Sequence, residues 1–90
     1  MQVVVIHRIT DPDKFFSMDA EQVASGGSSG AKGQQFYPST DRDFATCLWE
    51  TESTDRLREY LDPALEGVAE NTYFEVDGSR AMGLPEGATA

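Results

Sequence analysis

The chain has 90 residues, which suffices for one small domain and leaves no room for a second hydrophobic core. Sixteen acidic residues against seven basic ones give a formal net charge of -9. This charge disfavours nucleic acid and anionic membranes as partners, because both require a positively charged surface. No apolar run approaches the length of a membrane-spanning helix, and the N-terminus lacks the features of a signal peptide, so we expect a cytoplasmic protein.

The chain contains a single cysteine, Cys47, so no disulfide can form within it and no cysteine-based zinc cluster can be built. Cys47 lies in the middle of an apolar segment, which favours a buried packing thiol. The overall composition, with 39% hydrophobic and 26% charged residues, is typical of an ordinary folded domain.

Residues 2–9 (QVVVIHRI) are rich in β-branched side chains and predict the first strand. Alternation places one set of side chains on one face of this strand: Val3, Val5, His7 and Ile9. The opposite face then carries Val4, Ile6 and Arg8. Both faces are largely apolar, so we expect both to be covered.

A helix is predicted to follow, with Asp11 as its N-cap and Pro12 in its first turn, where the missing N–H costs nothing. Its buried stripe would comprise Phe15, Phe16, Met18 and Val23. Residues 25–33 (SGGSSGAKG) are expected to form a loop. The glycine spacing in this loop matches neither GxGxxG nor a Walker-type motif, which argues against a phosphate-binding cradle.

Residues 34–37 predict a short second strand that ends at Pro38, and a proline there fits the edge of a sheet. After a turn at residues 39–43, residues 44–50 (FATCLWE) predict the third strand. Its two faces carry Phe44, Thr46, Leu48 and Glu50 on one side and Ala45, Cys47 and Trp49 on the other. Both faces of this strand therefore also carry large side chains.

Ser53 is a good N-cap for a second helix, whose buried face would carry Leu57, Tyr60, Leu61, Ala64 and Leu65. Pro63 interrupts the pattern, so we expect the helix to stop near Leu61 and Asp62 to cap a further short turn ending at Gly67. Residues 71–76 predict the fourth strand. The predicted organisation is a single domain at residues 1–78 and a C-terminal tail at residues 79–90.

The order of these elements predicts an α+β fold of the ferredoxin-like βαββαβ type. Two right-handed strand-helix-strand units interleave most simply as one antiparallel sheet of order 4-1-3-2 with two helices on one face. The other face would remain bare, although the two central strands carry apolar residues on both sides. We therefore expect a homodimer in which a second copy of the chain covers this face.

The strands QVVVIHRI, FATCLWE and NTYFEVD, together with the acidic capped helix, resemble the dimeric α/β-barrel superfamily, and most closely its small bacterial branch that includes nickel-binding members. The resemblance covers about residues 2–77. It implies a ferredoxin-like subunit whose sheets pair into a barrel, with clefts that in various members hold haem, polyketides or chlorinated compounds. His7 falls where related members can have a strand histidine. It is the only histidine, so a nickel or copper site of several imidazoles does not carry over.

Five side chains are candidates for binding a ligand. His7 is the only group with an ordinary pKa near neutrality, and could act as a base or simply hold two elements together. Large rings with a polar tip, Tyr37, Trp49 and Tyr73, suit a small-molecule cleft but also suit a core or a dimer contact. The fifth is Glu50. Burial without a basic partner would raise its pKa and make it a candidate acid or base, and the same holds for Glu75. Arg8 is the expected partner of either carboxylate, and such an ion pair would be structural. No metal site or cofactor is predicted.

Three functions remain open at this stage. The first is a dimeric module that binds a small apolar or aromatic compound between sheet and helices. The second is a cofactor-independent monooxygenase or isomerase acting on a phenolic or quinone-like compound, with His7 accepting a proton while Trp49 and Tyr73 position the substrate. The third is a structural or protein-interaction module.

Overall fold

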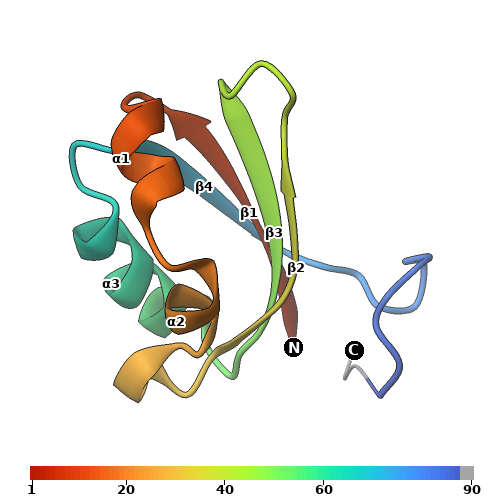
Figure 1. Ribbon diagram of the computed structural model, residues 1–90. Coiled ribbons are helices and arrows are strands. Elements are labelled where there is room, and N and C mark those ends of the chain that lie inside the picture. The colour runs from red at the N-terminus through yellow and green to blue at the C-terminus, as the bar shows by residue number, and fades with distance from the viewer. Residues whose placement is uncertain (88–90) are drawn as a thin grey trace.

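The computed structural model describes residues 1–87 and consists of one antiparallel sheet with its helices packed on one face (Figure 1). The strands are β1 (Gln2–Ile9), β2 (Lys32–Pro38), β3 (Phe44–Glu50) and β4 (Ala69–Glu75). The helices are α1 (Pro12–Ser17), α2 (Ala20–Ala24) and α3 (Thr54–Ala64), with a short 3-10 turn, η1 (Gly27–Ser29). The strand order is β2-β3-β1-β4, which is the predicted order 4-1-3-2 seen from the other edge. The predicted sheet is therefore confirmed.

The first crossover contains two short helices where the sequence predicted one. Asp11 caps α1 by accepting a hydrogen bond from the Lys14 amide, as expected. The chain then turns extended at Met18, and Asp19 caps α2 by accepting from two amides of the following turn. The expected buried stripe is also incomplete, since Phe15 is buried whereas its neighbour Phe16 is 38% exposed.

The C-terminal end of α3 differs from the prediction. Ser53 caps the helix at the expected place, accepting from the Arg56 amide, but the helix continues to Ala64 and includes Pro63. A proline in the last turn removes one amide donor, and the Leu65 amide still reaches the Leu61 carbonyl at 3.0 Å. Asp62 therefore does not cap a new turn. Its carboxylate accepts hydrogen bonds from β4 instead.

The edge strand β2 begins two residues earlier than predicted and pairs only with β3. Gly33 lies where α2 crosses this strand, and a Cβ atom there would come within 2.8 Å of the Ala24 Cβ. A larger residue at position 33 would push α2 away, so glycine permits the close approach of helix and strand. The predicted edge position of Pro38 is confirmed.

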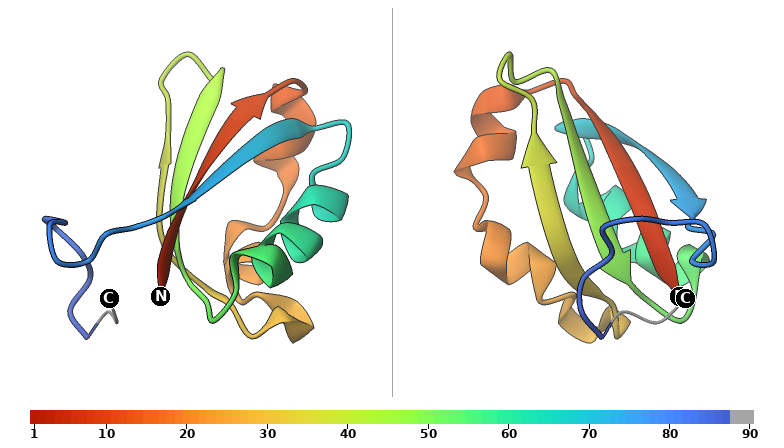
Figure 2. Two further views of the ribbon diagram at one scale, coloured as in Figure 1. Left: turned by 180° about the vertical axis from the view of Figure 1, so that it is seen from behind. Right: turned by 90° about the vertical axis from the view of Figure 1, so that its right-hand side faces the viewer.

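The core lies between the sheet and the helices. Its most completely buried apolar side chains are Val3, Val5, Trp49, Leu57 and Leu61. The other face of the sheet, which we call the open face, bears several large side chains that are partly or largely exposed: Ile6, Tyr37, Phe44 and Phe74. The tail after β4 runs on this side, opposite the helices (Figure 2). Residues 88–90 of the predicted tail lie outside the described residues.

No helix in residues 1–87 is both long and apolar enough to cross a membrane.

Candidate functional site

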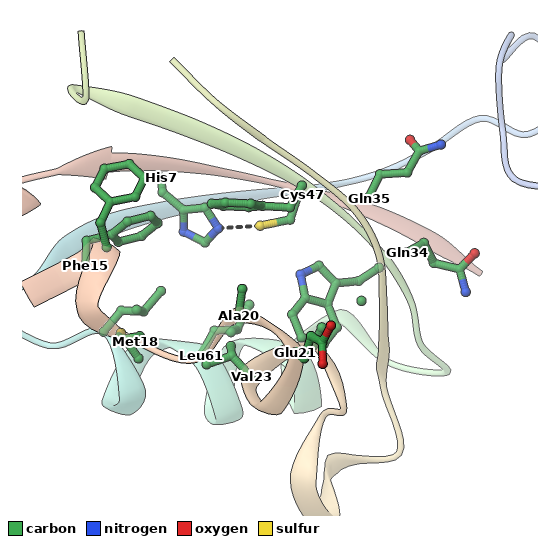
Figure 3. Close-up of a pocket in the computed structure, with 16 residues that line it drawn as sticks. His7, Phe15, Met18, Ala20, Glu21, Val23, Gln34, Gln35, Cys47 and Leu61 are labelled. Carbon is green, nitrogen blue, oxygen red and sulfur yellow. Dashed lines mark hydrogen bonds between the residues drawn. The ribbon is translucent and has the colours of Figure 1, made fainter. Parts of the chain in front are cut away.

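A cavity of about 350 Å³ lies between the helix-covered face of the sheet and the first crossover. Most of its wall is apolar and comes from α1, α2, α3 and the strands β2 and β3: Phe15, Met18, Val23, Phe36, Trp49 and Leu61. His7 and Cys47 lie on the sheet side of the wall, and the other polar lining residues include Glu21, Gln34 and Gln35. Figure 3 shows these two side chains pointing toward each other, with Met18, Val23 and Leu61 across from them. The volume and the apolar wall are typical of a small-molecule site.

The His7 imidazole is buried and has a partner on each ring nitrogen. Its Nδ1 lies 2.6 Å from the Oδ1 of Asn71 on β4, and its Nε2 lies 2.7 Å from the Sγ of Cys47 on β3. The Asn71 Nδ2 donates to Asp62, which leaves its Oδ1 to accept from the imidazole. His7 therefore carries its proton on Nδ1, and the unprotonated Nε2 accepts from the Cys47 thiol.

Burial sets the protonation states of this pair. The pKa of His7 is lowered from 6.5, because desolvation disfavours the imidazolium more than the hydrogen bond to Asn71 favours it. Burial likewise raises the pKa of the Cys47 thiol from 9.0 to about 11, and a hydrogen bond that Trp49 would donate to the thiolate offsets a part of that rise. At neutral pH the pair is a neutral imidazole beside a neutral thiol.

Trp49 contributes a buried donor to the same cavity. Its side chain is 2% exposed, packs edge-on against Tyr60, and lines the cavity wall. The indole Nε1 makes no hydrogen bond of acceptable geometry within residues 1–87. A buried N–H without an acceptor is costly, so an acceptor atom on a bound ligand would satisfy it.

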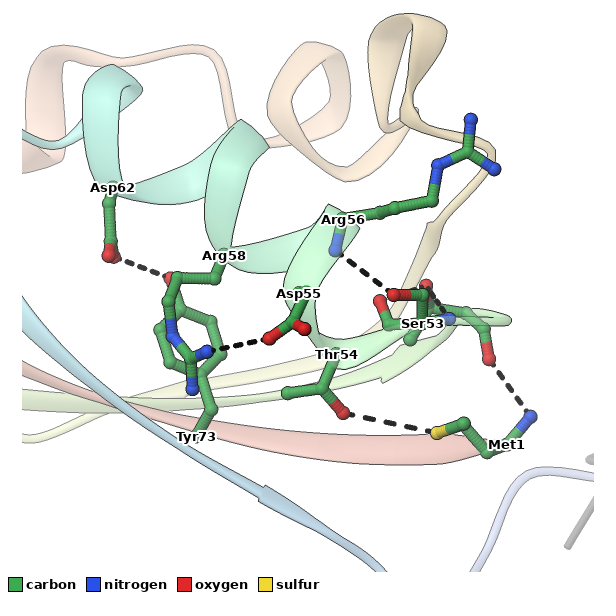
Figure 4. Close-up of polar contacts among 9 residues, drawn as sticks. Met1, Ser53, Thr54, Asp55, Arg56, Arg58, Asp62 and Tyr73 are labelled. Carbon is green, nitrogen blue, oxygen red and sulfur yellow. Dashed lines mark hydrogen bonds and ion pairs between the residues drawn. The ribbon is translucent and has the colours of Figure 1, made fainter.

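The polar chain continues from Asn71 to the rim of the molecule. Asp62 accepts from the Asn71 amide at 3.0 Å and from the Tyr73 hydroxyl at 2.7 Å. The Arg58 guanidinium lies over the Tyr73 ring, 4.9 Å from its centroid, and also pairs with Asp55 (Figure 4). Burial and the Asp62 carboxylate raise the pKa of Tyr73, so its hydroxyl stays protonated and donates. This network holds Asn71 in place from the side away from the cavity.

The sequence-predicted ligand residues do not all lie together. His7 and Trp49 line the cavity. Tyr73 belongs to the Asp62 network and is not among the lining residues, and Tyr37 is 63% exposed on the open face. Glu50 is hydrogen-bonded to Gln2 and lines a separate polar hollow at the other end of the sheet.

The expected ion pair between Arg8 and Glu50 or Glu75 is also absent from residues 1–87. Arg8 pairs with Glu70, its direct neighbour on β4. The reason is the register: Arg8 lies near the end of β1 at which β4 begins, whereas Glu50 and Glu75 lie opposite the start of β1.

Two site residues were missed by the sequence interpretation, namely the thiol of Cys47 and the amide of Asn71. Cys47 was treated as an inert packing group, and Asn71 only as the beginning of a strand. Alternation did group His7 with Val3 and Val5 and Cys47 with Trp49, and the structure turns both of these faces toward the helices. The predicted strand order already made β3 and β4 the neighbours of β1, but only the register of the two pairs brings the three side chains together.

No group of three or more histidine, cysteine, aspartate or glutamate side chains in the described part of the chain is arranged to hold a metal ion. A comparison with protein-family models found no match, and a comparison with curated proteins found none either. The resemblance to the dimeric α/β-barrel superfamily thus stays a prediction, and the site must be interpreted from its own geometry.

Proposed function

We propose that this protein binds a small apolar or aromatic compound in the cavity between the sheet and the first crossover. The observation that supports this proposal is the cavity itself, with a volume of about 350 Å³ and a mostly apolar wall. The rings of Phe15 and Phe36, which pack against each other in the cavity wall, would contact a flat ligand. The Trp49 Nε1 would give such a ligand one directional hydrogen bond.

The proposal can be tested with 1-naphthol, a mostly apolar bicyclic compound whose hydroxyl oxygen can accept one hydrogen bond. A ligand that binds only the folded state adds about 2.7 kcal/mol to the free energy of unfolding at 100 times its Kd. The midpoint temperature of thermal unfolding should therefore rise as the 1-naphthol concentration increases. Trp49 is the only tryptophan, so its fluorescence should report the same binding curve.

A matched pair of variants assigns the binding to the cavity. Ala20 lines the cavity and is exposed, so Ala20→Phe can fill the space without strain in the core. Gln22 lies on the same helix, is exposed and is not a lining residue, so Gln22→Phe adds the same ring elsewhere. Ala20→Phe should abolish the 1-naphthol response while Gln22→Phe keeps it. Equal responses of both variants would contradict binding in this cavity.

We also propose that the protein is a homodimer formed through the open face. The support is the set of large apolar side chains that this face exposes, of which Ile6 (38%), Phe44 (49%) and Phe74 (48%) come from three strands. A second copy would cover the same patch on both chains, as two-fold interfaces do. Sedimentation equilibrium should give twice the chain mass of 9.9 kDa at micromolar concentration, and a folded 9.9 kDa particle would refute the dimer.

A further inference from the structure

We infer that Cys47, His7 and Asn71 form a nucleophilic triad that takes an acyl group from a small aromatic or short-chain ester. The inference rests on the proposed function, because the ester would occupy the same cavity. It goes further in assigning a reaction, a nucleophile and a base to the site.

The sheet register builds the triad on three adjacent strands. Asn71 lies directly opposite His7 in the β1–β4 pair. Cys47 lies diagonally from His7 in the β1–β3 pair, since His7 is opposite Ala45 and Val5 is opposite Cys47. All three side chains project to the helix-covered face, and two of them line the cavity. Strand positions hold reacting groups more rigidly than loops do.

The hydrogen bonds give each group a defined role. Asn71 holds the Nδ1–H of His7 and thereby leaves Nε2 as the free base, 2.7 Å from the Cys47 sulfur. A thiol, a base within hydrogen-bond reach and a third group that orients the base are the parts of an activated cysteine nucleophile. Because both members of the pair are neutral at rest, the thiol proton moves to Nε2 as the sulfur attacks.

A second observation points to a ligand with an oxygen that gains negative charge. Trp49 lines the same cavity, and its buried Nε1–H, which lies near the Cys47 side chain, makes no hydrogen bond of acceptable geometry within residues 1–87. A donor that is unsatisfied before the reaction is available to the oxyanion of a tetrahedral intermediate. The apolar wall would hold the acyl group and the leaving group, and its size excludes a folded polypeptide as substrate.

The reaction proceeds in two balanced steps. In the first, the Cys47 sulfur bonds to the ester carbonyl carbon, His7 Nε2 takes the thiol proton, and the carbonyl oxygen becomes an oxyanion. The intermediate collapses by breaking the carbon–oxygen ester bond, and the leaving alcohol takes the proton from Nε2. In the second, a water gives a proton to Nε2 and its oxygen attacks the thioester. The carbon–sulfur bond breaks, Cys47 regains the proton and the carboxylic acid leaves.

The test uses 4-nitrophenyl butyrate and the full chain. The expected result is a rapid release of one 4-nitrophenolate per chain, followed by a slower steady rate. Intact mass and peptide mapping should place one butyryl group on Cys47, the only cysteine. Release without acylation of Cys47, or acylation of lysines alone, would overturn the inference.

Variants separate the roles of the three residues. Cys47→Ala should abolish the burst. His7→Gln keeps a polar side chain in the strand but cannot accept the thiol proton, so its burst should be about 100-fold slower. An unchanged burst rate in His7→Gln would exclude His7 as the base. Should this variant not fold, the butyryl-Cys47 adduct of the wild-type chain decides by itself whether Cys47 is the nucleophile.

Asn71 acts through His7 and is a positioning residue. Nitrogen NMR of the single histidine should show the Nδ1–H tautomer in the wild-type chain and a mixture of tautomers in Asn71→Ala, with a slower burst in the variant. If Asn71→Ala keeps the same single tautomer, Asn71 does not position His7.

A non-reacting ligand distinguishes failure of the triad from failure of the binding site. Butyrophenone has the same acyl chain and a phenyl ring but no ester bond. If butyrophenone raises the unfolding temperature and Ala20→Phe abolishes this rise, while 4-nitrophenyl butyrate leaves Cys47 unmodified, the cavity binds ligands and the triad is refuted. If neither compound interacts, both proposals fail.

Discussion

The Nδ1 of His7 lies 2.6 Å from the Oδ1 of Asn71, and this contact joins β1 to β4 inside an otherwise apolar core. Asn71 in turn reaches Asp62 on α3, so one buried imidazole is tied to three elements of the fold. Buried polar groups of this kind stabilise a fold only while every member has a partner.

Loss of Asn71 should therefore destabilise the protein. Asn71→Ala leaves the His7 Nδ1–H buried without its acceptor, and such a loss lowers the free energy of unfolding by about 1–3 kcal/mol. Gln22→Ala, at an exposed position of α2 on the helix side of the sheet, is the control and should change it by less than about 0.5 kcal/mol. Urea unfolding followed by circular dichroism measures both. Equal effects of the two variants would show that the buried contact contributes nothing.

His7 should make stability depend on pH in the acid range. Its pKa is lowered in the folded protein from 6.5, so below that value the unfolded chain binds a proton that the folded chain resists. The contribution of His7 is complete above pH 6.5 and declines as the pH falls below it. Urea unfolding between pH 7.5 and 5 should show this decline in the wild-type chain and a weaker one in His7→Gln. Parallel curves for the two proteins would contradict the burial of a neutral imidazole.

Cys47 should make the stability of the folded protein depend on pH in the alkaline range. The thiol pKa is raised from 9.0 to about 11 by burial, so the unfolded chain loses its proton first and stability declines as the pH rises above 9. Thiolate absorbance at 240 nm, taken as the difference between wild-type and Cys47→Ala, should have its midpoint near 11 in the folded state. A midpoint at or below 9 would show a solvated or preformed thiolate.

Much of the fold could be predicted because local pattern and tertiary structure agree. Residues 2–9 and 44–50 are mostly apolar segments of strand length bounded by turn residues, and both strands have the predicted bounds. The caps Asp11 and Ser53 were also correct. The break at Met18 was missed because the apolar spacing continues across it, and only Asp19 indicated a new start. The end of α3 was misplaced because tertiary contacts tolerate Pro63 in a last turn.

The site was less predictable because it depends on register and on unfilled space. His7 and Trp49 could be singled out because the polarity of their tips is a property of the residues themselves, and both lie in the cavity wall. The pairing of His7 with Cys47 depends on which residues of β1 and β3 lie opposite each other. The cavity arises where the short helices α1 and α2 leave the sheet incompletely filled, which residue spacing does not encode.

Tyr73 should stabilise the fold through its hydroxyl and not through ligand binding. Tyr73→Phe removes the 2.7 Å hydrogen bond to Asp62 and keeps the ring under Arg58, so the free energy of unfolding should fall by about 0.5–1.5 kcal/mol. Glu59→Gln, at an exposed position of α3 on the helix side of the sheet, is the control and should change the free energy of unfolding by less than about 0.5 kcal/mol. If Tyr73→Phe lowers the binding free energy of 1-naphthol by more than it lowers the free energy of unfolding, Tyr73 contacts the ligand.

The open face provides the last prediction. Ile6 lies at the centre of this face, on β1, and Ile6→Lys would place a charge where a second copy must exclude water. Gln22→Lys adds the same charge on α2, on the helix side of the sheet, and is the control. Sedimentation equilibrium should give a dimer for Gln22→Lys and a monomer for Ile6→Lys, with near-native circular dichroism for both. A dimeric Ile6→Lys protein would mean that the chains associate through some other surface, and the apolar side chains of the open face would then need a different cover.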